Sequence, residues 1–143
     1  MAEFTYNPVQ EVAAGESVIL NTAIGCNKGY VLHREESGIV TLRGVVNNPC
    51  SGFARYFCLF EANIAVPEGG TPGEISVSFA ISGEPVPTSL AAVTPTVAEA
   101  YFNVNSPIYI DVPAGCCYNI SVENTSGDPI NVRNANLIVT RVA

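Results

Sequence analysis

Charged residues are scarce in this sequence. Only 13% of its 143 residues are charged, about half the share of an average soluble domain, and the formal net charge is −7. The basic residues are few and scattered, and a negative chain repels phosphate groups, so we expect no nucleic-acid partner and no membrane partner. The surface is left to Ser, Thr, Asn, Gly and apolar atoms, a composition that favours self-association.

Histidine occurs once, as His33, and tryptophan does not occur. Acid–base catalysis near neutral pH usually recruits a histidine, but no nucleophile signature such as G-x-S-x-G is present, so we interpret His33 as a solvated loop residue. Two carboxylates such as Glu61 and Asp111 would hydrolyse a glycoside only if the fold brings them together, which the sequence leaves open. We therefore expect no enzyme activity and no catalytic residue, and the missing tryptophan argues against a sugar-stacking site.

No C-x-x-C pair occurs among the five cysteines, so we expect no zinc site and no other cofactor. The first residues, "MAEFTYNPVQ", lack the basic and apolar regions of a signal peptide, and no apolar stretch of about 18 residues could span a bilayer. If this is the whole gene product, it is made in the cytoplasm, where thiols stay reduced. A calcium site in loops near Asp111 and Asp128 stays open, although no D-x-D spacing supports it.

Apolar residues recur at every second position along most of the chain, which predicts an all-β protein. In "EISVSFAI" the alternation predicts a half-buried strand whose core face is Ile75, Val77, Phe79 and Ile81. Similar runs, separated by turns rich in Gly, Pro, Asn and Asp, occur at 17–20, 30–33, 38–44, 54–66, 89–93, 108–112, 118–124 and 136–142. Many short strands at this spacing indicate one sandwich or barrel domain.

Two adjacent cysteines open one of the later strands, in "CCYNISVE". Neighbouring strand residues point to opposite faces, so we expect Cys116, in phase with Tyr118 and Ile120, to be buried and Cys117 to face outward. A disulfide between adjacent cysteines would be strained, so we expect free thiols. Cys58 is in phase with Tyr56 and Phe60, so we expect it to lie in the core.

The last strand is apolar on both faces. In "NANLIVTRV" one face holds Ala135, Leu137 and Val139, and the other holds Ile138 and Val142. In a sandwich the inner face meets the opposing sheet, and an apolar outer face needs a second chain unless a loop covers it. We favour a self-association surface, with a covering loop as the alternative.

Three stretches carry a family resemblance. They are "VQEVAAGESVILN", with a glycine turn between two short strands; "YFNVNSPIYIDVPAGCCYNISVENTS", with an aromatic-asparagine strand and a "V-P-A-G" turn; and the final apolar strand "NANLIVTRVA". Together they resemble the TNF/C1q-like jelly-roll family over nearly the whole chain. The resemblance implies an all-β, jelly-roll sandwich of about ten antiparallel strands that forms a homotrimer, with strands near both termini packed about the three-fold axis.

The resemblance also assigns candidate contact residues. It places the trimer contact at Ile138, Thr140 and Val142, and further at Tyr101 and Phe102. The domain itself is expected to cover residues 9–143.

An amino-terminal arm is expected at residues 1–8. Its aromatic residues Phe4 and Tyr6 are candidates for docking on a capsid, and the alternative is that this segment folds against its own subunit.

The sequence as a whole, including "GEISVSFAISGEPV", is most similar to small virion-type proteins of tailed bacteriophages and prophages of Gram-positive gut bacteria. This similarity implies a non-enzymatic virion structural protein, most simply a trimeric capsid decoration protein that binds the major capsid protein. Its expected location is the capsid surface, after assembly in the host cytoplasm. The alternative is a ligand- or glycan-binding head domain of a phage fibre or bacterial surface protein.

Overall fold

The computed structural model describes residues 2–24, 31–33, 37–44 and 52–142. Within these ranges the chain forms strands and one short 3-10 helix, η1 (Pro87–Ser89), and no helix there is long and apolar enough to cross a membrane. The all-β prediction is confirmed. The strands are β1 (Ala2–Tyr6), β2 (Gln10–Val12), β3 (Thr22–Ile24), β4 (Val31–His33), β5 (Val40–Arg43), β6 (Phe53–Ala65), β7 (Ile75–Ile81), β8 (Glu84–Pro85), β9 (Ala91–Val93), β10 (Phe102–Pro113), β11 (Cys117–Asn124) and β12 (Ile130–Arg141).

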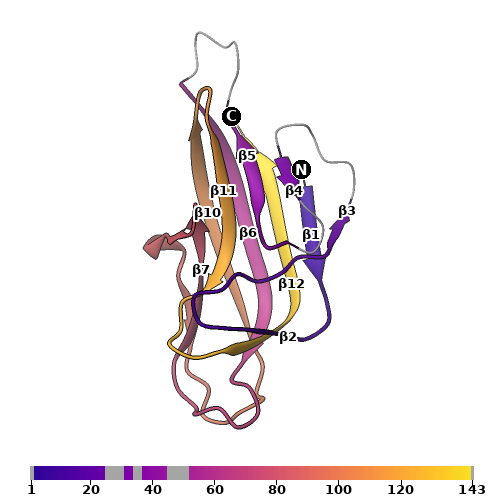
Figure 1. Cartoon of the computed structure of the whole chain (residues 1–143), viewed down its shortest axis with the longest axis vertical. Helices are drawn as coiled ribbons and strands as arrows, with labels where there is room; N and C mark the ends of the chain where they lie inside the picture. Colours follow the sequence, from indigo (N-terminus) through magenta and orange to yellow (C-terminus); the bar gives the residue numbers. More distant parts are fainter. Residues whose placement is uncertain (1, 25–30, 34–36, 45–51, 143) are drawn as a thin grey trace.

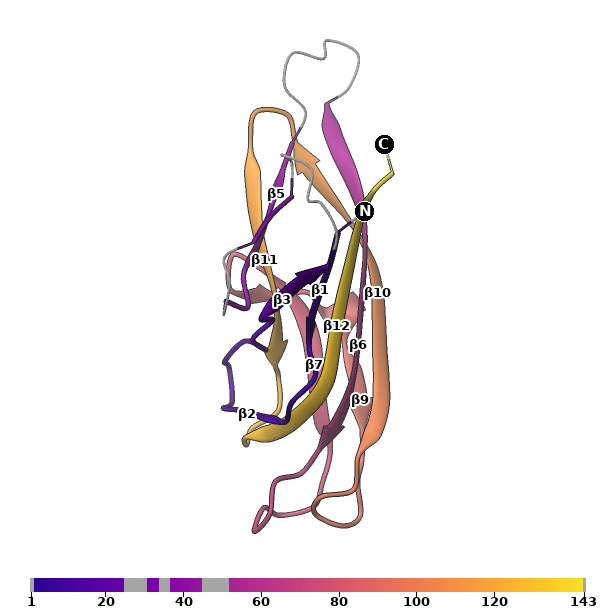
Figure 2. The same ribbon diagram turned by 90° about the vertical axis from the view of Figure 1, so that its right-hand side faces the viewer.

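The strands form two antiparallel sheets that pack face to face (Figure 1). The first sheet has the order β10-β6-β12-β1-β3, with β2 paired to β12. The second sheet has the order β4-β5-β11-β7-β8, with β9 paired to β7. Figure 2 views the sandwich from the side, with β12, β6 and β10 in one layer and β5 and β11 in the other. Because the first strand pairs with the last, both ends of the chain are tied into the first sheet.

Apolar side chains from both sheets fill the space between the layers. The Tyr56 hydroxyl donates a hydrogen bond to the backbone carbonyl of Arg43 on the opposite sheet, which satisfies a polar atom inside the core. Cys58 is buried, as predicted, and its burial raises the pKa of the thiol to about 12 because the thiolate loses its hydration. The largest fully buried side chains are those of Tyr56, Phe4, Phe60, Phe79, Leu20 and Leu42.

Strand β7 is buried on both faces, whereas alternation predicted a half-buried strand. Its core-facing side chains pack as expected, but Ser76, Ser78 and Ala80 on the other face are buried as well. The Ser76 backbone N–H donates to Ser126 Oγ at 2.8 Å, and its hydroxyl lies 2.7 Å from Thr125 Oγ1. The turn after β11 therefore packs onto β7. The alternation of residues within β7 could not predict this contact, because it is made by residues about 50 positions away.

Strand β12 changes phase at a bulge. Its register with β6 shifts between Arg133 and Asn136, and Asn134 between them has a φ of 54°. Even-numbered residues face the core before the bulge, and odd-numbered residues face it afterwards. The predicted core residues of the last strand are therefore confirmed, namely Ala135, Leu137 and Val139.

The amino-terminal segment is part of the sandwich, not a separate arm. Strand β1 pairs with β12 on one side and with β3 on the other. Phe4 is 0% exposed, and its ring centroid lies 4.6 Å from that of His33. A fully buried ring cannot dock on a second protein, so the prediction of Phe4 as a docking residue is wrong. The alternative holds: residues 2–6 fold against their own subunit, with Tyr6 partly exposed at the end of β1.

Cys116 is exposed, and the prediction that it is buried is wrong. Strand β11 begins one residue later, and Cys116 follows Gly115, which has a φ of 74° in the turn. Strand alternation does not extend into a turn, so the phase argument does not apply there. Cys117 is exposed, as predicted, and Cys58, Cys116 and Cys117 are free thiols. The remaining cysteines, Cys26 and Cys50, lie outside the described residues.

Candidate functional site

The outer face of the first sheet carries an apolar patch at its centre. Ile138 on β12 pairs with Leu59 on β6, which pairs on its other side with Pro107 on β10. In the next row, Phe57 on β6 pairs with Tyr109 on β10, with 5.3 Å between the ring centroids. We define the outer apolar patch as Phe57, Leu59, Pro107, Tyr109 and Ile138.

The outer apolar patch remains accessible in the isolated chain. Tyr109 is 63% exposed, and Val142, just beyond the end of β12, is 50% exposed. Phe57, Leu59 and Ile138 are half-buried, because they shield one another. In the part of the chain that the structure describes, no loop covers Tyr109. The outer face of this sheet therefore offers apolar area to a partner.

One edge of the patch is bordered by an ion pair. Arg55 donates from Nε to Asp111 Oδ1 at 2.8 Å and from Nη2 to Oδ2 at 3.1 Å. The guanidinium also lies 5.4 Å from the ring centroid of Phe53 and 5.9 Å from that of Tyr109. Hydrogen bonding from Arg55 lowers the pKa of the Asp111 carboxyl. The charges of Arg55 and Asp111 neutralise each other, so this edge of the patch carries a planar, bidentate ion pair beside the rings of Phe53 and Tyr109.

The opposite edge of the patch is polar. Asn103 on β10 donates from Nδ2 to Glu61 Oε1 at 3.2 Å and to Asn63 Oδ1 at 3.3 Å. The guanidinium of Arg133 lies 3.8 Å from the ring centroid of Tyr101. The face thus has an apolar centre between two polar edges, the arrangement typical of protein–protein contacts.

The structure separates the predicted contact residues into two groups. Ile138 and Thr140 lie on the outer face of β12, and Val142 extends it. Tyr101 lies at the far polar edge against Arg133, and it does not touch the patch. Phe102, 45% exposed, opens β10 in the phase of the core-facing residues, so it does not belong to the outer face.

Sequence reasoning missed the other members of the patch. Phe57 and Leu59 fall out of phase with the buried residues of β6, so that strand, like β12, is apolar on both faces. The same signal that identified Ile138 was therefore present in β6. Tyr109 gives a weaker signal, because its neighbours on that face are Pro107 and Asp111.

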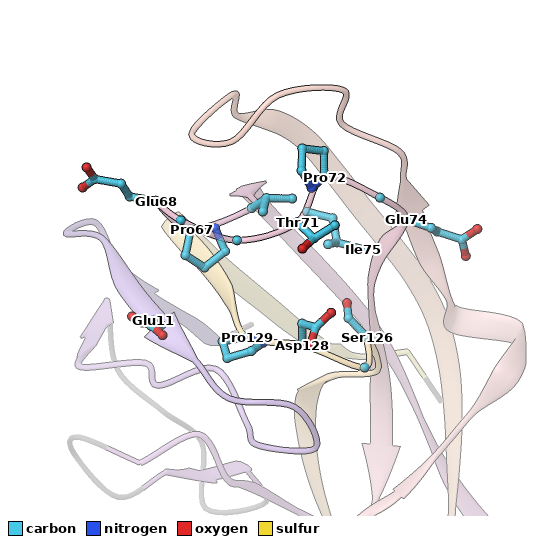
Figure 3. Close-up of a pocket in the computed structure, with 15 residues that line it drawn as sticks. Glu11, Pro67, Glu68, Thr71, Pro72, Glu74, Ile75, Ser126, Asp128 and Pro129 are labelled. Carbon is cyan, nitrogen blue, oxygen red and sulfur yellow. The ribbon is translucent and has the colours of Figure 1, made fainter.

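A concave surface lies among the loops at the end of the sandwich away from the termini (Figures 1 and 3). The cavity has a volume of about 520 Å³ and lies between the loop 66–75 and the turn 126–129. Figure 3 shows Glu68 and Glu74 extending away on opposite sides, while Ser126 and Asp128 lie beneath the loop. Its lining is acidic and hydroxyl-bearing, and it contains prolines but no aromatic ring.

The candidate catalytic and metal residues do not converge. Glu61 and Asp111 lie six residues apart along the β6–β10 pair, which is roughly 20 Å, far beyond the spacing of glycosidase carboxylates. His33 is in strand β4, partly buried, and its Nε2–H donates to the carbonyl of Ser37 at 2.9 Å, so its interpretation as a solvated loop residue is wrong. Among the described residues, no group of three or more His, Cys, Asp or Glu side chains could hold a metal ion.

No protein-family model and no curated protein sequence matches this chain. Its structure is similar to that of the globular domain of zebrafish complement 1qA protein, with a TM-score of 0.61 at 12% identity, covering 96% of this chain and 94% of that one. Eiger TNF from S. frugiperda gives a TM-score of 0.67 at 11% identity, covering 100% of this chain and 92% of that one. At these identities the likeness shows the fold alone, a TNF/C1q-like jelly roll.

Proposed function

We propose that this chain is a non-enzymatic module that associates with copies of itself through the outer apolar patch. The patch is the observation that carries the proposal, because a sheet packed on one face exposes Tyr109, Val142 and the half-buried Leu59–Ile138 pair on the other. Removing such area from water is worth about 25 cal/mol per Å². The low charge content supports the same conclusion, since interface centres are poor in charged residues.

The proposed assembly is a homotrimer. Support comes from the TNF/C1q-like fold, for which the sequence resemblance implies three copies about an axis near the terminal strands. In the first sheet β1 and β12 are adjacent, and β12 carries part of the patch. Light scattering on the purified chain is expected to give the mass of three chains. A monomer at micromolar concentration would refute the proposal.

The proposed role of the trimer is a virion structural one, as a decoration protein on a phage capsid with the major capsid protein as partner. This step rests only on the resemblance to virion-type proteins that was inferred from the sequence, and no family model or curated sequence adds to it. A trimer fits a three-fold position of a capsid lattice, where each subunit repeats the same contact and the three contacts add up. Imaging of particles labelled at this protein is expected to place the label on the head.

The loop cavity favours a second candidate function, a ligand-binding head. The Thr71 hydroxyl can donate or accept a hydrogen bond, and the Asp128 carboxylate can accept one, from a hydroxyl-rich ligand. Label at a tail tip instead of the head would favour this function over the capsid role. Binding of cell-wall polysaccharide that is lost in Asp128→Ala, with the trimer intact, would identify the cavity as the site.

A further inference from the structure

A different cavity lies on the outer face of the second sheet, away from the outer apolar patch. Its volume is about 300 Å³, and its walls include Ser17, Ile39, Asn119 and Glu123. A shallower depression shares Ile39 and Asn119 with it and extends across β4 and β5 to Leu32. Together they form a groove with a carboxylate at one end and exposed aliphatic side chains, Ile39 at 50% and Leu32 at 41%, along it.

Glu123 is the unusual residue of this cavity. It is only 8% exposed, because the chain at 15–18 runs beside β11 and hydrogen-bonds to it. Among the described residues, no side chain or backbone N–H donates to its carboxylate and no basic group pairs with it. The Glu123 oxygens are not among the fully buried side-chain atoms without a partner, and Glu123 lines the cavity, so the carboxylate is open to the cavity and free to bind a cationic ligand there.

The neighbour of Glu123 across the sheet is unpartnered too. Glu123 pairs in register with Ser78 on β7, so the two side chains lie next to each other on the same face. Ser78 is 1% exposed, and its Oγ has no hydrogen-bond partner among the described residues. The burial of Glu123 and the charge of Glu16 raise the pKa of the Glu123 carboxyl, as expected for a carboxylate without a counter-ion. Ser78 does not line the cavity, so the Glu123 carboxylate is the group there that lacks a positive, hydrogen-donating partner.

We propose that this cavity binds an alkylammonium group, with the Glu123 carboxylate as counter-ion and Ile39 in contact with the alkyl stem. An ammonium supplies three donors and one positive charge, which matches the single buried carboxylate and the adjacent hydroxyl and amide oxygens. A calcium ion fits less well, because it takes six to eight oxygen ligands and part of this wall is aliphatic. Among the described residues, no basic side chain lines the cavity to compete with the ligand.

Two sources can supply this chemistry, a small free amine or a lysine side chain of another protein. The cavity volume of about 300 Å³ is at the small end of ligand sites, which suits either one. The inference does not depend on the outer apolar patch, which belongs to the other sheet.

The test is an amide chemical-shift titration of the full-length protein at neutral pH. Butylamine hydrochloride is the probe, with sodium chloride as the ionic-strength control and 1-butanol as the neutral analogue of the same shape. We expect saturable shifts at Ile39, Asn119 and Ser121 with butylamine only. Glu123→Gln is expected to weaken binding at least about tenfold, whereas Glu74→Gln, which removes a carboxylate from the loop cavity, a cavity that shares no residue with this one, changes it less than about twofold.

Glu123→Asp keeps the charge but shortens the side chain, and an intermediate affinity is expected from it. It also keeps the test valid if Glu123→Gln does not fold. Equal binding of butanol and butylamine, unchanged affinity in Glu123→Gln, or no saturable shift at the cavity would each overturn the proposal. Comparison of putrescine with Nα-acetyl-lysine methylamide then identifies the source, since the tighter binder shows whether the stem belongs to a free amine or to a lysine.

Discussion

Ile138→Asp is the sharpest test of the self-association surface. Ile138 lies at the β12 side of the outer apolar patch, between Leu59 on β6 and Glu3 on β1. In a single chain the new carboxylate would still reach water, because this position is only half-buried. In an assembly that covers the patch, the same carboxylate would be buried without a positive partner.

The cost of the Ile138→Asp carboxylate therefore differs strongly between the assembly and the single chain. Burial of an unpaired carboxylate costs several kcal/mol, and a closed trimer would bury three copies, so we expect a loss of about 10 kcal/mol of association free energy. That corresponds to a dissociation constant raised by about 10⁷-fold, enough to leave only single chains at micromolar concentration. The single chain should lose only about 1–2 kcal/mol, from the low strand propensity of aspartate and its repulsion by Glu3.

The assay combines light scattering with circular dichroism. Ile138→Asp is expected to have the mass of one chain and the strand spectrum of the wild type. Leu32→Asp is the matched control, since Leu32 is 41% exposed and lies on β4 in the second sheet, whereas the patch lies on the first. If Ile138→Asp keeps the wild-type mass, or if Leu32→Asp loses it equally, the outer apolar patch is not the interface.

Three further predictions concern the subunit itself. Alkylation of the native protein followed by peptide mapping should label Cys116 and Cys117, and should label Cys58 only after unfolding, because Cys58 is buried with a pKa of about 12. Asn124→Ala should lower the free energy of unfolding in urea by about 3 kcal/mol, since its side chain bonds three backbone groups and is 1% exposed; a loss below 1 kcal/mol would contradict this. Folding raises the pKa of Glu123, so the wild type should lose stability as pH rises above about 4.3, and Glu123→Gln should show a flatter pH profile of unfolding free energy.

Much of the sandwich could be predicted from alternation, because an inward and an outward face differ in chemistry along most strands. The core residues of β12 and the buried position of Cys58 follow from phase alone. The predictions failed where the backbone leaves the strand conformation, as at Cys116 in its turn. They also failed at Phe4, because whether a terminal segment adds to a sheet depends on a pairing with residues more than 130 positions away.

The outer apolar patch could be predicted one strand at a time but not as a surface. Phe57, Leu59 and Ile138 each stand out as apolar residues on the outward phase of their strands. What joins them is register: Leu59 lies beside Ile138 only because β6 and β12, distant in sequence, pair with that offset. A shift of one residue would have moved every one of these side chains to the opposite face.

Glu123 shows the same limit at the cavity on the second sheet. Its phase on β11 matches Asn119, which is exposed, so alternation predicts a solvated glutamate. The carboxylate is buried because the segment 15–18 lies alongside β11 where β5 has ended, with Val18 N–H donating to the carbonyl of Val122 at 2.8 Å. The unsatisfied charge is thus produced by tertiary packing and not by the local sequence. A search for binding sites in this fold is therefore better directed at polar groups that packing leaves without partners than at motifs, and Glu123 beside Ser78 is such a pair.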